Sequence, residues 1–438
     1  MNKKLLSLLA VAFASFSFGQ YQTQNFAIPL QYAYPNVISI VDANTVWATA
    51  RDGSGNNTYP RYASITTNGG TNWAAKLISA PSNALISDIH GVDGQTAFVV
   101  TAPASGSGAA NGLYKTTNGG TSWSKISGVF GNASFGNIIH FFDTQTGLVI
   151  GDPVNNKYEM YKTTDSGNTW SVLTTAPIPL HADEYGYVGG KVGFGNSLWL
   201  TSNTGRILHT TDFGATWNSY TGGPVDDFSG QDSNATMSFS SETYGLLVDN
   251  IGFLWYTEDA GANWDIKETT GYFNGDVKYI PGSNSNFMTT NMNLDSTLGI
   301  GSSYSNDGGN TWISIDGDEQ RGHIGAYDCS TIWVGYFTSN TAGNEGMLKL
   351  TDPIPGCSLA VSDTNIIKTE LKAVVSNGVL NIVTNKDIKD VVVGDMSARS
   401  LASANKKEVN VSQLKAGVYY ARVAYVDGSF GTVKFVIK

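Results

Sequence analysis

Eight polar side chains stand near the start of predicted strands, where they could contact a ligand. They combine amide, carboxylate, phenol, guanidinium and imidazole groups, and such a mixture suits a sugar or a peptide. Two carboxylates facing each other across a pocket could instead serve as acid and base in glycoside hydrolysis. The candidate ligand-binding residues are Asn137, Glu184, Tyr185, Asp232, Asn274, Asp276, Arg321 and His323. The alternative for each of them is a solvated loop residue without a ligand.

Other catalytic chemistries have no support in the sequence. The five histidines show no paired spacing for zinc. The loop that begins at Asp52 lacks the Glu that closes an EF-hand, because Ala63 occupies that position. No Gly-rich loop precedes a helix, and no Gly-x-Ser-x-Gly motif occurs in a strand-turn-helix setting. We therefore predict no catalytic residue, no metal and no cofactor.

The composition favours many short strands joined by tight turns. The 438 residues include 50 Gly, only 14% of residues are charged, and runs of helix-forming residues with a helical period are missing. The net charge is -10, so there is no basic stripe to bind nucleic acid or an anionic membrane surface. We predict no nucleic-acid partner.

One eight-residue phrase recurs six times. It begins with Ser or Thr, has Asn or Asp at its third position and Gly at its fifth, and ends with Trp. The Asn or Asp can accept hydrogen bonds from turn amides, the Gly supplies a positive φ, and the Trp buries a large ring as the next strand begins. The structural pairs are Asn68 and Trp73, Asn118 and Trp123, Asp165 and Trp170, Asp212 and Trp217, Asp259 and Trp264, and Asp307 and Trp312. Successive Trp residues are 47 to 50 positions apart, which indicates a repeat architecture.

These phrases resemble the Asp-box, or bacterial neuraminidase repeat, Ser/Thr-x-Asp-x-Gly-x-x-Trp. The resemblance implies a turn between the third and fourth strands of a propeller blade. Each period also holds strand-like stretches before its box, such as 97–100 and 113–115, so four strands per period are expected. We predict an all-β chain.

A seventh repeat is present in altered form. Residues 346–352 align with 112–118, but Ile354 replaces the box Gly and Cys357 stands in place of the Trp. This unit has three strands of its own, and the stretch Tyr21–Ile28 is expected to add the fourth and close a seven-bladed ring. Closure removes two exposed sheet edges.

The two cysteines both belong to this last blade. Cys329 lies in its first turn, and Cys357 lies at its box position, so both are expected on one face. We predict a Cys329–Cys357 disulfide, since disulfides form in exported proteins. Two free thiols are the alternative.

The N-terminus is typical of a signal peptide. Lys3 and Lys4 precede an apolar stretch over residues 5–18, and Gly19 suits cleavage. The stretch is too short to cross a bilayer comfortably, and no other segment is apolar enough. We predict a signal peptide at 1–19, a propeller at 20–357 and no integral membrane span.

The tail, 358–438, has no box and no Trp, and its strand-like runs predict a small Ig-like β-sandwich. Residues 394–399, 409–420 and 434–438 resemble the type A sorting domain of the type IX secretion system. Ser376-Asn377-Gly378 stands near the place of the family's usual Pro-Asn-Pro. The resemblance implies a secretion-machinery partner, export through the periplasm, and a secreted or outer-surface location.

The propeller as a whole also resembles the photosystem II assembly factor family, whose members bind a partner protein and catalyse nothing. A sialidase is disfavoured, because that family clamps its substrate with three Arg and the first predicted inner strand here lacks its Arg-bearing motif. We expect a non-catalytic propeller that binds an extracellular protein or glycan. A secreted glycoside hydrolase with paired carboxylates at the channel mouth is the alternative.

Overall fold

A computed structural model describes residues 21–355 and 371–437, apart from 57, 105–107, 109, 132, 230–233, 297, 385, 395–399 and 427–429. The chain divides into two compact units, Met1–Ser358 and Leu359–Lys438. The described residues of both units form strands and turns without a helix, so none of them lies in a helix that could span a membrane.

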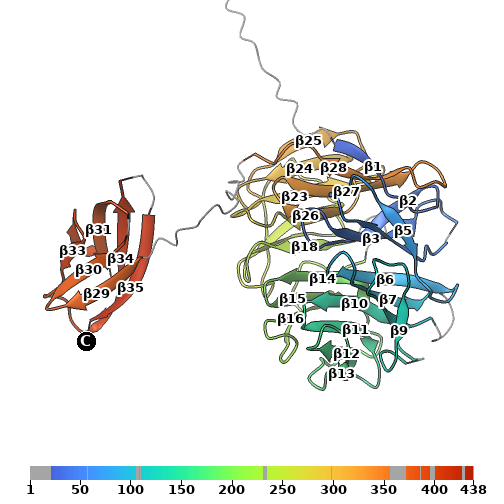
Figure 1. Ribbon diagram of the computed structural model, residues 1–438, viewed down its shortest axis with the longest axis horizontal. Helices are drawn as coiled ribbons and strands as arrows, with labels where there is room; N and C mark the ends of the chain where they lie inside the picture. The colour runs from blue at the N-terminus through green and yellow to red at the C-terminus, as the bar shows by residue number, and fades with distance from the viewer. Residues whose placement is uncertain are drawn as a thin grey trace, which may run out of the picture. The chain divides into compact units, whose positions relative to one another are not determined.

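The first unit is a seven-bladed β-propeller (Figure 1). Each blade is a four-stranded antiparallel sheet, and the first strands of neighbouring blades contact one another around the central axis. The prediction of seven blades is confirmed.

The first four blades contain sixteen strands in chain order. Blade 1 is β2 (Ala33–Ile40), β3 (Val46–Asp52), β4 (Tyr62–Thr66) and β5 (Ala74–Leu77). Blade 2 is β6 (Ala84–Gly91), β7 (Ala97–Pro103), β8 (Gly112–Thr116) and β9 (Ser124–Ile126). Blade 3 is β10 (Gly136–Phe141), β11 (Gly147–Pro153), β12 (Tyr158–Thr163) and β13 (Ser171–Val172). Blade 4 is β14 (Gly186–Phe194), β15 (Ser197–Ser202), β16 (Ile207–Thr210) and β17 (Asn218–Tyr220).

Blades 5 and 6 again contain four consecutive strands, whereas blade 7 takes its fourth strand from the N-terminus. Blade 5 is β18 (Thr236–Phe239), β19 (Gly245–Val248), β20 (Leu254–Thr257) and β21 (Asp265–Ile266). Blade 6 is β22 (Asp276–Tyr279), β23 (Phe287–Asn291), β24 (Gly301–Ser305) and β25 (Ile313–Gly317). Blade 7 is β26 (Ile324–Asp328), β27 (Thr331–Thr338), β28 (Glu345–Leu350) and β1 (Tyr21–Asn25).

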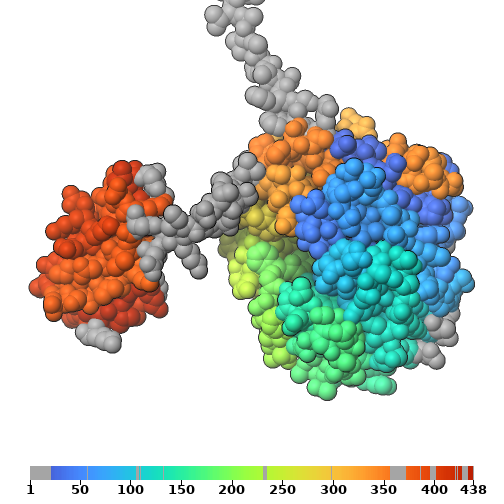
Figure 2. Space-filling view, viewed as in Figure 1, coloured from blue at the N-terminus to red at the C-terminus, as the bar shows by residue number. Residues whose placement is uncertain are grey.

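The ring closes through β1, as the sequence predicts. β1 pairs antiparallel with β28, from Tyr21 opposite Leu350 to Asn25 opposite Gly346. In Figure 2 the blue N-terminal residues therefore border the orange residues of the last blade. Lys349 of β28 also donates to the carbonyl of Gly69 in blade 1 at 2.8 Å, so the first and last blades are joined directly.

All six box phrases adopt the same hydrogen-bonded turn. The hydroxyl of the first residue donates to the side-chain oxygen of the Asn or Asp, at 2.8–3.0 Å. The same hydroxyl accepts the amide of the box Gly, again at 2.8–3.0 Å. In five blades a box amide also bonds to the turn between the first two strands, as in the 2.9 Å bond from Gly69 to Asn44. The two turns therefore lie on the same face.

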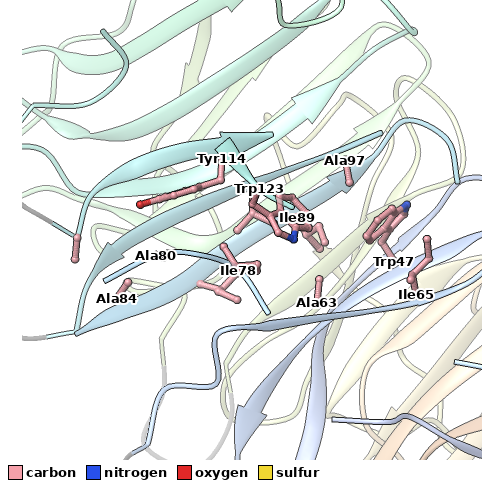
Figure 3. Packing of buried hydrophobic residues seen from close by; sticks show 13 residues of the cluster. Trp47, Ala63, Ile65, Ile78, Ala80, Ala84, Ile89, Ala97, Tyr114 and Trp123 are labelled. Atoms are coloured by element: carbon pink, nitrogen blue, oxygen red, sulfur yellow. The ribbon is translucent and has the colours of Figure 1, made fainter. Parts of the chain in front are cut away.

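The hydrophobic core lies between neighbouring blades. Figure 3 shows this packing between blades 1 and 2, where Trp47 of β3 meets Trp123, the last residue of the second box. The two rings are 6.0 Å apart, edge to face, and the indole of Trp47 donates to the carbonyl of Asp93 at 2.9 Å. Each box Trp thus belongs to a layer of side chains shared by two sheets.

The second unit consists of two antiparallel sheets with one hydrophobic core. One sheet contains β29 (Lys372–Ser376), β30 (Val379–Val383) and β33 (Glu408–Asn410). The other contains β31 (Ile388–Gly394), β32 (Ser400–Ala404), β34 (Gly417–Tyr425) and β35 (Phe430–Ile437). Leu380 of the first sheet and Val391 and Val423 of the second are buried in the same cluster. The assignment of this unit to an Ig-like fold stays a prediction.

Cys329 is buried in blade 7 at the position that the sequence predicts. The amide of Ile354 donates to the carbonyl of Cys329 at 3.0 Å, which holds the chain beside this cysteine three residues before Cys357. Cys357 itself lies outside the described residues, so the disulfide stays a prediction.

Peptide mapping without reductant is expected to find Cys329 linked to Cys357. Reduction is expected to lower the free energy of unfolding by roughly 3–4 kcal/mol, because the bond closes a loop of about 28 residues. The double variant Cys329→Ser, Cys357→Ser is the control, and its unfolding should not respond to reductant. Alkylation of both thiols without reduction would contradict the prediction.

Candidate functional site

A cavity of about 440 Å³ opens at one end of the central channel. Its described lining residues come from blades 1, 4, 5, 6 and 7, mostly from the beginnings of the first strands. The strands of a blade are antiparallel, so the chain changes face with each strand. The box turn follows the third strand and therefore lies on the face opposite to the start of the first strand. The cavity is therefore on the face opposite the boxes, where the loops between second and third strands also lie.

A bulge in β14 shapes this cavity. Gly186 pairs with Ser202, but the next pair is Lys191 with Leu200, so residues 187–190 leave the ladder. Gly189 has a φ of 66°, and a Cβ added there would lie 3.5 Å from Val37 Cγ2. The bulge of blade 4 therefore reaches blade 1 across the channel. Gly adopts this left-handed conformation at no steric cost.

A buried ion pair holds the base of the bulge. The ammonium of Lys191, in β14, contacts the carboxylate of Asp88 and the carbonyl of Ile139. Asp88 also accepts the amides of Ile89 at 2.9 Å and Ile139 at 2.8 Å. Burial raises the pKa of Asp88 and lowers the pKa of Lys191, while their mutual attraction opposes both shifts. One cluster thus connects blades 2, 3 and 4.

Two of the eight candidate residues line the cavity. The Nδ1 atom of His323 lies 3.5 Å from Oδ2 of Asp276, and the same oxygen accepts the amide of Ile324 at 2.9 Å. A third candidate, Tyr185, is exposed, and its ring is 5.6 Å from the ring of Tyr187, which lines the cavity. These three residues are accessible to a ligand on this face.

Two charged candidates form ion pairs within the fold. Glu184 is buried, its carboxylate lies 3.3 Å from the guanidinium of Arg206, and it accepts the hydroxyl of Tyr158 at 3.0 Å. Arg321 donates from Nε to Asp316 at 2.8 Å and stacks on the ring of Tyr21. Both stabilise contacts between elements and neither lines the cavity.

Two amide candidates bond to the second strands of their own blades, and one candidate is not described. Asn137 donates to Asp152 at 2.7 Å, and Asn274 accepts a hydrogen bond from Asn291 at 3.1 Å. Asp232 lies outside the described residues. Within the described ranges, no group of three or more His, Cys, Asp or Glu is placed to hold a metal ion.

The sequence-based selection omitted two exposed cations of the cavity, Arg51 and Lys278. Lys278 lies two positions after Asp276 on β22, and alternate strand residues face the same side, so this spacing indicates a shared wall. Arg51 lies at the end of a second strand, whereas the candidates were sought only at the starts of first strands.

Comparison with known proteins supports this architecture. A family model described as Photosynthesis system II assembly factor YCF48 matches residues 132–279. The match and the structure together show that the first unit is similar in fold to the propellers of this family. The solved structure "YCF48 bound to D1 peptide" is similar over 78% of this chain and 97% of its own, with 15% identity and a TM-score of 0.52. No curated protein matches the chain.

Two further solved structures show lower structural similarity. YCF48 from Cyanidioschyzon merolae has 14% identity and a TM-score of 0.49, over 76% of this chain and 98% of its own. An ancestral GH74 enzyme has 12% identity and a TM-score of 0.49, over 94% of this chain and 63% of its own.

The Asp152→Asn variant is expected to lose the part of the pH dependence of the free energy of unfolding that the Asp152 carboxyl group causes. Burial raises the pKa of Asp152 from 3.8 to about 6, although Asn137 and the Gly186 amide bond to it. Because the pKa of Asp152 is higher in the folded than in the unfolded protein, its protonated form stabilises the folded state. This contribution to the free energy of unfolding is complete below about pH 4 and is lost as the pH rises through about 6. At pH 7 the variant should be more stable than the natural protein, by on the order of 1–2 kcal/mol.

Urea unfolding from pH 4 to 7 measures this difference. Asp265→Asn, which changes an exposed carboxylate of β21, is the matched control. Parallel stability curves for the natural protein and Asp152→Asn would contradict the assigned shift.

Proposed function

We propose that this chain is an exported, non-catalytic propeller that binds a partner protein at the cavity of its channel mouth. The observation that carries the proposal is a cavity lined by both apolar and hydrogen-bonding side chains, as in sites that hold a ligand segment. The similar YCF48 structure has a D1 peptide bound. A glycan that occupies the same cavity is the second ligand class that this chemistry permits.

The arrangement of carboxylates argues against hydrolysis. Asp276 is the one carboxylate among the described lining residues, and it is already held by Ile324 and His323. Glycoside hydrolysis ordinarily requires two carboxyl groups about 5–9.5 Å apart. Asp88 and Glu184 are buried in ion pairs, so neither is available as the second group.

Export is part of the same proposal. The predicted signal peptide would direct the chain to the periplasm, and the second unit would serve as the type IX sorting domain. This unit has its own hydrophobic core and is a compact unit distinct from the propeller, which supports a role separate from that of the propeller. The box phrases would then be Asp-boxes with a structural role on the face opposite the ligand.

Site-specific photo-crosslinking tests the binding site. A photo-reactive residue in place of Tyr34, which lines the cavity, is expected to capture a protein from the cell-surface fraction of the source organism. The same residue at Lys125, on the outer strand of blade 2, is the control and should capture nothing in common with it. Identical products from both positions would contradict a site at the channel mouth.

Sugar release from a polysaccharide panel tests the hydrolase alternative. The purified protein is expected to release no reducing sugar above background. Turnover that is abolished by Asp276→Asn but retained by Asp265→Asn would overturn the non-catalytic assignment, because it would assign catalysis to the cavity carboxylate.

A further inference from the structure

The cavity is cationic although the whole chain carries a net charge of -10. Its described lining includes Arg51, Lys191 and Lys278 against one carboxylate, Asp276. Asp88 neutralises Lys191, but neither Arg51 nor Lys278 forms an ion pair within the described chain. Exposed, unpaired cations beside a partly enclosed space attract an anionic group more strongly than isolated surface charges do.

The cationic groups are partly positioned in advance. Arg51 donates from Nε to Oδ1 of Asn36 at 2.8 Å, and Asn36 also lines the cavity. Lys278 lies on β22, whose first residue, Asp276, is bonded to the next blade. Side chains carried by ordered strands lose less conformational freedom when a ligand binds.

Four exposed apolar side chains lie on the same face, on the loops between second and third strands of blades 5 and 6. We call them the apolar arc: Ile251, Phe253, Leu294 and Leu298, with 76%, 50%, 71% and 41% of their surfaces exposed. The two loops touch, because a Cβ added at Gly252 would lie 3.7 Å from Leu298 Cδ1. Adjacent exposed apolar residues of this size are typical of a protein interface.

The loop that carries Ile251 and Phe253 is rigidly held. Asp249 is buried, and its carboxylate accepts the amides of Ile251 at 3.0 Å and Phe253 at 2.8 Å. Its second oxygen accepts the indole N–H of Trp255 at 2.8 Å. A buried carboxylate thus fixes the backbone of a loop that presents apolar side chains to solvent, and this is preorganisation for a contact.

Hydrogen bonds attach both loops of the arc to segments next to the cavity. Asn250 donates to the carbonyls of Asp227 at 3.0 Å and Ser229 at 3.2 Å, and Phe228 between them lines the cavity. In blade 6, Ser296 donates to Asn274 at 2.8 Å, two residues before Asp276. Both loops of the arc are therefore attached to segments that form the cavity wall.

Resting on the function proposed above, we infer that the partner segment is an acidic, apolar polypeptide. Its carboxylate occupies the cavity beside Arg51 and Lys278, and its neighbouring aliphatic or aromatic side chains cover the apolar arc. A uronic-acid polysaccharide satisfies the cations but has no apolar side chains for Ile251 and Leu294. The arc therefore selects a polypeptide over an acidic glycan.

A random 12-residue peptide display library, selected against the full-length protein, provides the probe. Selected sequences are expected to be enriched in Asp or Glu and in Leu, Ile or Phe. In fluorescence anisotropy, Arg51→Gln and Lys278→Gln should each weaken binding about tenfold or more, and high salt should weaken it further. Ile251→Ser with Leu294→Ser should also weaken binding about tenfold, with little effect on the salt dependence.

Matched surface changes separate these effects from damage to the fold. Lys125→Gln and Val172→Ser alter an exposed cation and an exposed apolar residue of blades 2 and 3, which do not line the cavity, and both should bind as the natural protein does. Selection of neutral or basic peptides would overturn the inference, and so would binding that is indifferent to Arg51→Gln or to the arc variant.

Polygalacturonate distinguishes the other acidic ligand class. Binding of polygalacturonate that requires Arg51, with no selected peptide bound, would overturn the polypeptide assignment. If photo-crosslinking at position 34 still captures a protein while no acidic, apolar peptide binds, then the proposed function stands and this inference fails.

Discussion

Two hydrogen bonds made by the hydroxyl group of the first box residue fix the turn on which six of the seven blades depend. The hydroxyl donates to the Asn or Asp and accepts the amide of the box Gly in all six copies. One small side chain thus satisfies two groups of a tight turn that would otherwise need water. With the turn fixed, the box Trp emerges at a constant position and packs into the layer between two sheets. The regular box turns and the burial of the box Trp rings follow from this one arrangement.

The repeat also gives the propeller two different faces, one formed by the box turns and one formed by loops that vary between blades. Box turns and first turns bond to each other on one face, which leaves little freedom to change their sequences. On the other face the loops differ from blade to blade, and the longest interruption of a first-strand ladder in the described propeller is at residues 187–190 of blade 4. Its bulge crosses the channel and is held by Lys191 and Asp88. The cavity lies between this bulge and residues of blades 1, 5, 6 and 7.

The architecture was largely predictable from the sequence, whereas the site was predictable only in part. The six boxes and the altered seventh repeat indicate seven blades, and the missing fourth strand of that repeat indicates that β1 closes the ring. Asp276 and His323 line the cavity because they begin first strands, but Glu184 turns inward to Arg206, a partner 22 positions away that no local pattern reveals. Arg51 and the bulge were missed for a similar reason. Arg51 and the bulge line the cavity because segments far apart in the sequence approach one another across the channel, and spacing along the chain does not reveal this.

The pairing of Tyr21 with Leu350 has a consequence for how the molecule folds. The first strand of the propeller to be synthesised must wait for the last one before it acquires a partner. Until then β28 has an unpaired edge and the N-terminal strand has no sheet to join, so the final step is a contact of very high sequence separation. Such contacts form slowly because the intervening chain must first be ordered. Ring closure is therefore expected to come late in folding, when the open chain of blades becomes a closed ring.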